Sequence, residues 1–412
     1  EIRGIADNQN MEPEMMPILE EKLKEFPDRY KYLKKEHDMK LLTLIDKKVN
    51  NNIELTLEEL KFLYELDSKI EGFGYRRDPR IKEIKSKRNY KKDYAYLFNI
   101  KEEEIALSQE EWEKNPDNFK LLNGNLDLFY YDSLNNIVLP KYIIDGDLNL
   151  GDLTSAEGLV LPQRVDGHLF LAGLDTAEGL VLPEYIGGDL KLNSLNTAKG
   201  LVLPKSIGGD LKLNSLNTAD GLVLPESIGG GIYLNSLTNA VGLVLPQYLG
   251  GNINLNSLTN ADGLVLPESI GGGIYLYSLT NADGLVLPKS IGGDISLNSL
   301  TNADGLVLPK SIGGDISLNS LTNAEGLVLP ESIGGDISLD SLTNAVGLVL
   351  PESIGCYIRL RGLKSGYDLK LPYSFDLKQL WCPDFIKEEI MNNPDKYYMN
   401  PPTEEEKKRI KR

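Results

Sequence analysis

The chain has 412 residues, a formal net charge of −17 and two cysteines, Cys356 and Cys382. Two cysteines are too few for a disulfide framework or a four-thiolate zinc site within one chain. The acidic balance argues against nucleic acid as a partner, because binding to phosphates needs a stripe of Lys or Arg. No apolar run approaches the roughly 20 residues that cross a bilayer, so we expect no membrane span.

Residues 1–120 are charged, lack internal repeats and carry the pattern of short helices, which predicts an α-helical N-terminal domain. Thr56 and Glu59 have the spacing of a capping box, and the apolar pattern that follows runs to Ile70, so we expect an amphipathic helix there. Further helices are expected at about 15–26, 29–48, 78–87 and 109–114.

A unit of 21 residues then repeats without an insertion over residues 121–372. Its proline recurs every 21 residues from Pro162 to Pro372, and Pro140 lies one residue further away at the start. A strict period in this range is typical of a stacked solenoid in which each unit contacts its neighbours. We therefore predict a mainly β fold, a parallel β-solenoid of about 12 coils with two strands per coil.

Within one unit, two stretches have the pattern of short strands. In the unit that begins at Gly200 these are the apolar run 200–204 and the alternating run 210–214. Gly208 and Gly209 lie between them and are expected to turn a corner at positive φ. The Leu, Ile and Ala side chains of the unit are expected to point inward. A single coil cannot fold alone, because ordering its residues costs more than its apolar burial contributes.

Residues 373–412 are expected to form a short C-terminal cap, with a helix at 385–392 and a charged tail at 404–412. Between Lys141 and Pro372 there are 24 acidic and 12 basic residues, which favours a basic protein partner or simple solubility. A cytoplasmic location is favoured. A secreted or surface location stays open, because the start at Glu1 without Met allows for the removal of a targeting segment.

Two segments resemble known families. Leu211, Leu213 and Leu216 reproduce the L-x-L-x-x-L spacing of leucine-rich repeats in bacterial solenoid proteins. Ile207 departs from that pattern, because it lies four positions ahead of the first of these leucines where the family has three. The resemblance implies an interaction scaffold whose strand face binds a partner, and a parallel β-solenoid outside that family fits the same residues. The stretch Leu57–Arg88 resembles a helical module of uncharacterised bacterial proteins, which implies no activity.

The outward positions of the second strand form three columns when the coils stack. The first column is rich in Asp, as at Asp189 and Asp210, and a cation would relieve the repulsion between stacked carboxylates. The nine-residue period of calcium-binding repeats is missing, so we expect no metal and no other cofactor. The third column is mostly Asn, for which we expect side-chain ladders from coil to coil.

The second column varies most along the array and is the expected binding face. Aromatic side chains on a polar strand favour contact with protein or carbohydrate. The alternative is aromatic packing between coils on a solvated face. The expected binding residues, the last of which belongs to the third column, are Lys191, Lys212, Tyr233, Asn254, Tyr275 and Tyr277.

The other expected strand contributes one outward valine per unit. We call this set the valine stripe; it comprises Val202, Val223, Val244, Val265, Val286, Val307, Val328 and Val349. Monomers rarely expose so long an apolar patch. Either corners and prolines half cover the stripe, or it is a surface for a partner. The expected assembly residues are Val223, Val244, Val265, Val286 and Val307.

The motifs give no support to catalysis. His37 and His168 are the two histidines, and the chain has no G-x-S-x-G, Walker or H-E-x-x-H motif. We therefore predict a non-enzymatic protein-binding or scaffolding protein. One alternative is a structural or adhesion protein that self-associates along the valine stripe. Another is an effector with an activity in its helical N-terminal domain.

Overall fold

The computed structural model describes residues 21–22, 29–73, 77–131, 133–134, 137–351, 353–372, 375–399, 402–403 and 406–407. The chain divides into two compact units, Glu1–Ile105 and Ala106–Arg412. Almost all of the helix expected at 15–26 and most of the charged tail expected at 404–412 lie outside the described residues.

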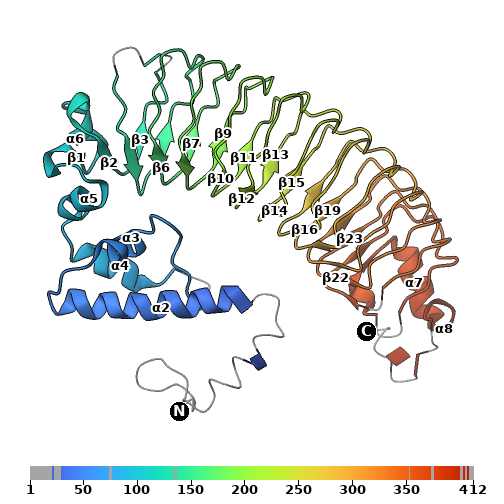
Figure 1. The fold of residues 1–412 in the computed structure, drawn as a ribbon. Coiled ribbons are helices and arrows are strands. Elements are labelled where there is room, and N and C mark those ends of the chain that lie inside the picture. Colours follow the sequence, from blue (N-terminus) through green and yellow to red (C-terminus); the bar gives the residue numbers. More distant parts are fainter. Residues whose placement is uncertain are drawn as a thin grey trace. The chain divides into compact units, whose positions relative to one another are not determined.

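The described part of the first unit is helical (Figure 1). Its elements are α2 (Arg29–Asn50), α3 (Leu57–Leu63), α4 (Pro79–Ser86), α5 (Tyr90–Phe98) and the 3-10 helix η1 (Glu102–Glu104). The capping box at α3 is confirmed, because Thr56 accepts from the Glu59 N–H and the Glu59 carboxylate accepts from the Thr56 N–H. The helix ends at Leu63 and not at Ile70, since Glu65 adopts a positive φ of 56° that an α-helix cannot continue through.

The helices expected at 29–48 and 78–87 are confirmed as α2 and α4, whereas α5 is an element that the sequence pattern did not predict. The side chain of Asn89 caps α5 by accepting from the Lys92 N–H, and the helix ends at Asn99 in the left-handed region, with φ 51°. Tyr94 is fully buried, as are Leu42 and Ile45 of α2. Aliphatic residues make up most of this small core, and Tyr64 and Tyr94 are its largest side chains.

The second unit is a parallel β-solenoid of about 12 coils with a 21-residue repeat, as predicted. The second strands of the coils form one 13-stranded sheet. Its members are β3 (Leu126–Asp127), β5 (Leu148–Asn149), β7 (Leu169–Phe170), β9 (Leu190–Lys191), β11 (Leu211–Lys212), β13 (Ile232–Tyr233), β15 (Ile253–Asn254), β17 (Ile274–Tyr275), β19 (Ile295–Ser296), β21 (Ile316–Ser317), β23 (Ile337–Ser338), β25 (Ile358–Arg359) and β26 (Leu380–Trp381).

The first strands of the coils form two further sheets. The eight-stranded sheet contains β1 (Ile105–Ala106), β2 (Leu121–Asn123), β4 (Tyr142–Ile144), β6 (Arg164–Val165), β8 (Tyr185–Ile186), β10 (Ser206–Ile207), β12 (Ser227–Ile228) and β14 (Tyr248–Leu249). The five-stranded sheet contains β16 (Ser269–Ile270), β18 (Ser290–Ile291), β20 (Ser311–Ile312), β22 (Ser332–Ile333) and β24 (Ser353–Ile354). In Figure 1 the strand arrows follow one side of the stack, and the irregular return loops form the other.

The first strand of each coil follows the proline, so the prediction of a strand at 200–204 is wrong. In that coil the strand is Ser206–Ile207, and residues 200–204 are irregular. Pro204 has no N–H to donate to a ladder. Gly200 adopts a φ of 82°, outside the range of a strand. The second expected strand is confirmed as the shorter Leu211–Lys212.

The paired glycines of each unit serve a different purpose from the one expected. Gly208 and Gly209 do not adopt positive φ; the positive φ of the coil belongs to Gly200. A Cβ atom on Gly208 would lie 2.2 Å from the carbonyl oxygen of Gly187 in the preceding coil. The coils therefore approach each other so closely at this corner that no side chain fits.

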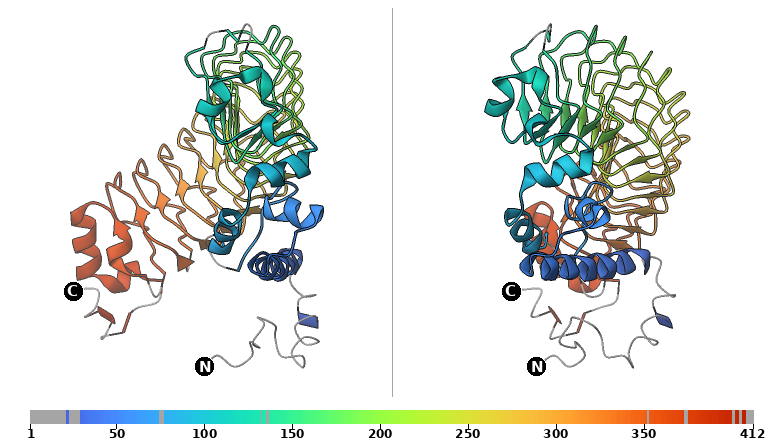
Figure 2. Two further views of the ribbon diagram at one scale, coloured as in Figure 1. Left: turned by 90° about the vertical axis from the view of Figure 1, so that its left-hand side faces the viewer. Right: turned by 60° about the vertical axis from the view of Figure 1, so that its left-hand side comes forward.

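The core of the solenoid consists of the inward Leu, Ile and Ala side chains, as predicted. Leu211, Leu213 and Leu216 are fully buried, and Ala219 is nearly so. The unit opens with α6 (Gln109–Glu113) and the 3-10 helix η2 (Pro116–Asn118). It closes with the 3-10 helix η3 (Leu377–Gln379), α7 (Asp384–Asn392) and α8 (Pro394–Tyr397). Figure 2 shows α7 and α8 beside the last coils, and α7 confirms the helix expected at 385–392.

Candidate binding surfaces

We call the three columns of outward positions on the 13-stranded sheet the strand face. The side chains of its first column accept hydrogen bonds. Asp189 Oδ1 accepts from the Asp210 N–H at 2.9 Å, and Asp210 Oδ1 accepts from the Gly231 N–H at 2.8 Å. Asn252 does the same for Gly273 at 2.7 Å. The carboxylates therefore serve the backbone of the next coil. Among the described residues there is no group of three or more His, Cys, Asp or Glu side chains suited to a metal ion.

His168 occupies the same column and performs the same task. Its Nδ1 accepts from the Asp189 N–H at 2.8 Å, while Asp147 Oδ1 accepts from the N–H of His168 at 2.7 Å. The imidazole therefore takes the place of a carboxylate in the ladder. One nitrogen of a neutral imidazole accepts a hydrogen bond, and in His168 the backbone of the next coil uses this acceptor.

The third column forms the asparagine ladder that the sequence predicts. Asn214 Nδ2 donates to Asn193 Oδ1 at 2.9 Å, Asn235 Nδ2 to Asn214 Oδ1 at 2.8 Å, and Asn256 Nδ2 to Asn235 Oδ1 at 2.9 Å. Tyr277 follows in the next coil, and its side chain is 40% exposed. Each amide thus binds its own counterpart one coil away.

Strand register brings five of the six expected binding residues side by side. Lys191, Lys212, Tyr233, Asn254 and Tyr275 are successive partners in the 13-stranded sheet. Lys191 Nζ lies 4.3 Å from the centre of the Phe170 ring, and Lys212 Nζ lies 4.7 Å from that of Tyr233 and 3.2 Å from the Asp210 carboxylate. Both ammonium groups are thus engaged within the chain, by cation–π contacts and an ion pair.

The tyrosines of this column are also held by neighbours. Tyr275 Oη donates to Asp294 Oδ2 at 3.0 Å, and its ring meets Tyr277 edge-on at 5.9 Å between centres. Burial, followed by the hydrogen bond to Asp294, raises the pKa of Tyr275 to about 12. Asn254, which we expected to point outward, is only 9% exposed, and its Nδ2 has no hydrogen-bond partner in the structure.

In two coils a glycine in the first column accompanies a tyrosine in the second, a pattern that is visible in the sequence but has no place among the predictions above. Gly231 and Gly273 occupy the first column in the two coils that carry Tyr233 and Tyr275. A Cβ on either glycine would lie 3.2 Å from the Cε2 atom of the tyrosine in its own coil. Each ring therefore covers a glycine, a geometry that favours aromatic packing on the coil surface over an open binding site.

The valine stripe is strongly exposed. Its eight side chains are between 62% and 75% exposed, and Val160 and Val181 continue the series toward the N-terminal end. The leucine before each stripe valine is buried, for example Leu222 before Val223. The chain therefore turns the valine outward, and no described part of it half covers the stripe.

The charges three residues before and after the valines differ between the two sides. Three residues before Val265, Val286, Val307 and Val328 lies a set that we call the acidic flank: Asp262, Asp283, Asp304 and Glu325. All four are exposed, and no ion pair is found for them in the described residues. Three residues after the same valines, Lys289 lies 3.5 Å from Glu268 and Lys310 lies 3.5 Å from Glu331. One side is neutralised within the chain, and the other is not.

One stretch of the array carries no charge. Residues 227–261 contain no Asp, Glu, Lys, Arg or His, because Val241, Gln247 and Asn252 replace residues that are mostly charged in other units. Val241 is 61% exposed and Tyr248 is 60% exposed. The ladder of the first strands is interrupted at the end of this stretch, between β14 and β16.

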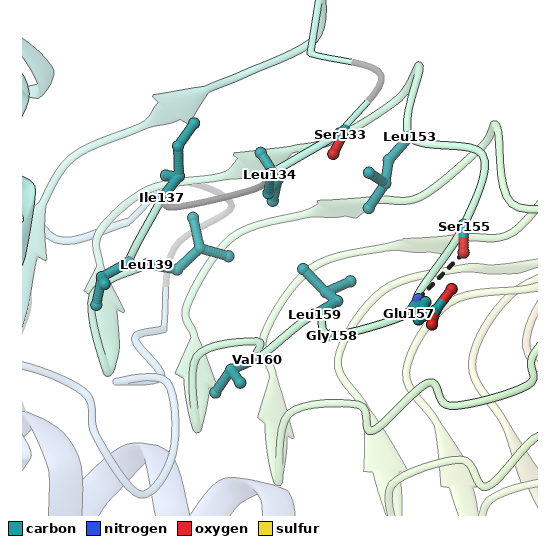
Figure 3. A pocket seen from close by; sticks show the side chains of 11 residues that line it. Ser133, Leu134, Ile137, Leu139, Leu153, Ser155, Glu157, Gly158, Leu159 and Val160 are labelled. Carbon is teal, nitrogen blue, oxygen red and sulfur yellow. Dashed lines mark hydrogen bonds between the residues drawn. The ribbon is translucent and has the colours of Figure 1, made fainter.

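A cavity of about 810 Å³ lies beside the first coil (Figure 3). Leu134 forms part of its lining and stands six residues before Pro140, where each later unit up to that of Pro351 has Ala six residues before its proline. Val138 and Val160 also line the cavity. Glu157 is the one titratable side chain among the described lining residues.

The helical unit contains a buried ionic cluster. Asp93 accepts from Tyr64 Oη at 2.8 Å and from Arg88 Nε and Nη2 at 2.6 and 2.7 Å. Burial, followed by the Asp93 charge, raises the pKa of Tyr64 far above its usual value. The charges of Asp93 and Arg88 are therefore paired within the cluster, which is typical of a structural role.

The two histidines lie in different units. His37 is exposed on α2 in the first unit, and His168 lies in the second.

The two cysteines are free thiols. Cys356 is exposed and Cys382 is half-buried, and burial raises the pKa of Cys382 to about 11. A raised pKa leaves little thiolate near neutral pH, so Cys382 is a poor nucleophile.

Comparison with protein-family models, curated proteins and solved structures finds no match to this chain. None of the helices described is long and apolar enough to cross a bilayer.

Proposed function

We propose that the protein binds a protein partner through the solenoid and acts without catalysis. The observation that carries this proposal is the exposure of the valine stripe, at 62–75% for each of eight side chains in consecutive coils. An apolar row of this length is unusual on the surface of a monomer and typical of interaction sites. The uncharged stretch 227–261 adds to it, because the centres of protein interfaces are depleted in charge.

The valine stripe supports binding better than the strand face does. On the strand face Lys212 contacts Tyr233 and Tyr275 binds Asp294, and Tyr277 remains the most exposed of the expected binding residues. A partner would have to displace those contacts. On the valine stripe a partner would cover apolar side chains that water now surrounds, which is favourable by about 25 cal/mol per Å².

Capture experiments with the whole chain test this proposal. Val265→Ser/Val286→Ser/Val307→Ser should lose the partners that the unaltered chain retains. The control Thr280→Ser/Thr301→Ser/Thr322→Ser changes exposed residues of the same coils that are not part of the stripe or of the acidic flank, and it should retain them. If the valine variant keeps every partner, the stripe is not the binding site. If the partners are lost only with Tyr275→Ala/Tyr277→Ala, the binding site lies on the strand face.

Self-association along the stripe is the second candidate, and the same exposure supports it. Light scattering distinguishes the two, because a chain that assembles through the stripe has a mass above that of the monomer. Val265→Glu/Val286→Glu would then reduce the mass. An unchanged mass in this variant rules out assembly through these valines.

A further inference from the structure

We propose that the stripe from Val265 to Val328 binds an amphipathic α-helix with a cationic edge. The helix would place a row of apolar side chains on the valines and a row of Lys or Arg on the acidic flank. This inference rests on the proposed function and specifies the chemistry of its partner. Two independent features carry it, the distribution of charge and the irregular backbone of the valine segment.

The charge distribution calls for a cation on one side of the stripe only. The acidic flank places four exposed carboxylates at corresponding turn positions of successive coils, and like charges repel each other. Three residues beyond the valines, Lys289 and Lys310 already pair with Glu268 and Glu331 at 3.5 Å. A partner with basic residues along one edge would pair the acidic flank and leave the neutralised side undisturbed.

The backbone around the valines favours a helix over an added strand. An extended peptide binds by adding a strand to a sheet edge through main-chain hydrogen bonds, whereas an amphipathic helix binds through the apolar side chains of one face. The valine segment is irregular, as in residues 200–204, and lies outside the strands of the solenoid. A helix therefore finds on the stripe the apolar side chains that it needs, and a strand finds no strand beside the valines to pair with.

A second copy of the chain complements this surface less well. If two copies face each other with opposite stack directions, the acidic flank meets acidic residues. If they face each other with the same stack direction, the acidic flank meets the opposite side of the other stripe. There, two carboxylates would meet Lys289 and Lys310, and two would meet Glu268 and Glu331. Neither arrangement pairs all four carboxylates.

Synthetic peptides test the inference on the full chain. The probe is a fluorescein-labelled helical peptide of roughly 15 residues, about four turns, with Leu along one face and Lys along one edge of that face. One matched peptide carries Glu in place of Lys, and another has the same composition scrambled into an alternating, extended pattern. We expect the Lys helix to bind about tenfold or more tightly than either, as fluorescence anisotropy would measure.

Two charge variants locate the site. Asp262→Asn/Asp283→Asn/Asp304→Asn should weaken binding of the Lys helix about fivefold to tenfold, because each exposed ion pair contributes modestly. Asp117→Asn/Asp152→Asn/Asp175→Asn removes the same charge from exposed positions elsewhere and should change binding less than twofold. Val265→Ser/Val286→Ser/Val307→Ser should weaken it as well.

Several results would overturn the inference. Equal binding of the Lys and Glu helices, equal effects of the two charge variants, or tighter binding of the extended peptide would each do so. A dimer in light scattering that the valine variant dissociates would assign the stripe to a second copy. The proposed function can survive these results: if natural partners are still lost with the valine variant, the stripe binds a partner of other chemistry.

Discussion

The two sides of the same coils treat repetition differently. On the strand face a side chain meets its own counterpart one coil away, so Asn binds Asn and each Asp accepts from the next coil's backbone. On the valine side, the stripe and the acidic flank find no such contacts among the described residues. Repetition stabilises a solenoid where a side chain can bind the equivalent residue or backbone of the next coil. Valine and carboxylate side chains do not bind their equivalents here, so their repetition produces an extended apolar and acidic surface instead.

The largest effect should come from residues that point inward in the same coil as a stripe valine. Leu300 is fully buried and Val286 is strongly exposed. Leu300→Ala should lower the free energy of unfolding by about 2–5 kcal/mol, because it leaves a cavity. Val286→Ala should change it by less than about 0.5 kcal/mol. Urea unfolding followed by circular dichroism measures both, and similar losses would show that the valine is part of the core.

The next largest difference in stability is expected between alanine substitutions at two glycines of one coil. A Cβ on Gly292 would lie 2.3 Å from the carbonyl oxygen of Gly271, whereas Gly284 has open space and a φ of 75°. Gly292→Ala should cost about 3 kcal/mol, because the neighbouring coil must move. Gly284→Ala should cost about 1 kcal/mol, because the backbone is strained but nothing clashes. The reverse order of unfolding midpoints would contradict the close approach of the coils.

Removal of a carboxylate should lower stability on the strand face but not on the acidic flank. Asp315 Oδ1 accepts from the Asp336 N–H at 2.7 Å, so Asp315→Ala should cost about 1 kcal/mol. Asp315→Asn should restore most of that loss, because Asn252 fills the same role in another coil. Asp304→Ala, on the acidic flank, should leave stability unchanged or slightly raise it. A clear loss there in a urea titration would reveal a structural partner for the flank.

The smallest effect concerns pH and the strand face. The pKa of Tyr275 is raised to about 12 in the folded chain, against about 10 when unfolded. A raised pKa means that the folded state holds its proton longer, so this contribution is complete below pH 10 and is lost as pH rises toward 12. Tyr275→Phe should flatten that part of the stability profile. An identical slope in both proteins would contradict the burial of the hydroxyl.

Much of the solenoid follows from the sequence because its signals are periodic. The 21-residue spacing predicts the coil count, and the inward Leu and Ile positions follow from it. The position of the first strand does not follow from apolarity, because residues 200–204 are more apolar than the strand Ser206–Ile207. Apolarity indicates burial, whereas strand pairing needs backbone N–H groups, and Pro204 has none.

The sequence predicts where the outward side chains of the candidate surfaces lie, but not which neighbours they contact. The alternation around each valine predicts an outward side chain, and the exposure of the stripe agrees with it. The cation–π contact between Lys212 and Tyr233 does not follow from their column alone, because it depends on which neighbour each side chain reaches in the next coil. The pairing of Gly231 with Tyr233 is visible in the sequence, yet its meaning needs the distance between ring and backbone.

Two neighbouring units are nearly interchangeable. Residues 284–304 and 305–325 differ only at their last position, Asp304 against Glu325. Deletion of residues 284–304 would join Asp283 to Gly305, the same Asp–Gly junction that precedes both units, so the chain would close with one coil fewer and no foreign sequence. The length of the stripe is therefore adjustable in whole coils, and each such deletion would remove one stripe valine and one carboxylate of the acidic flank.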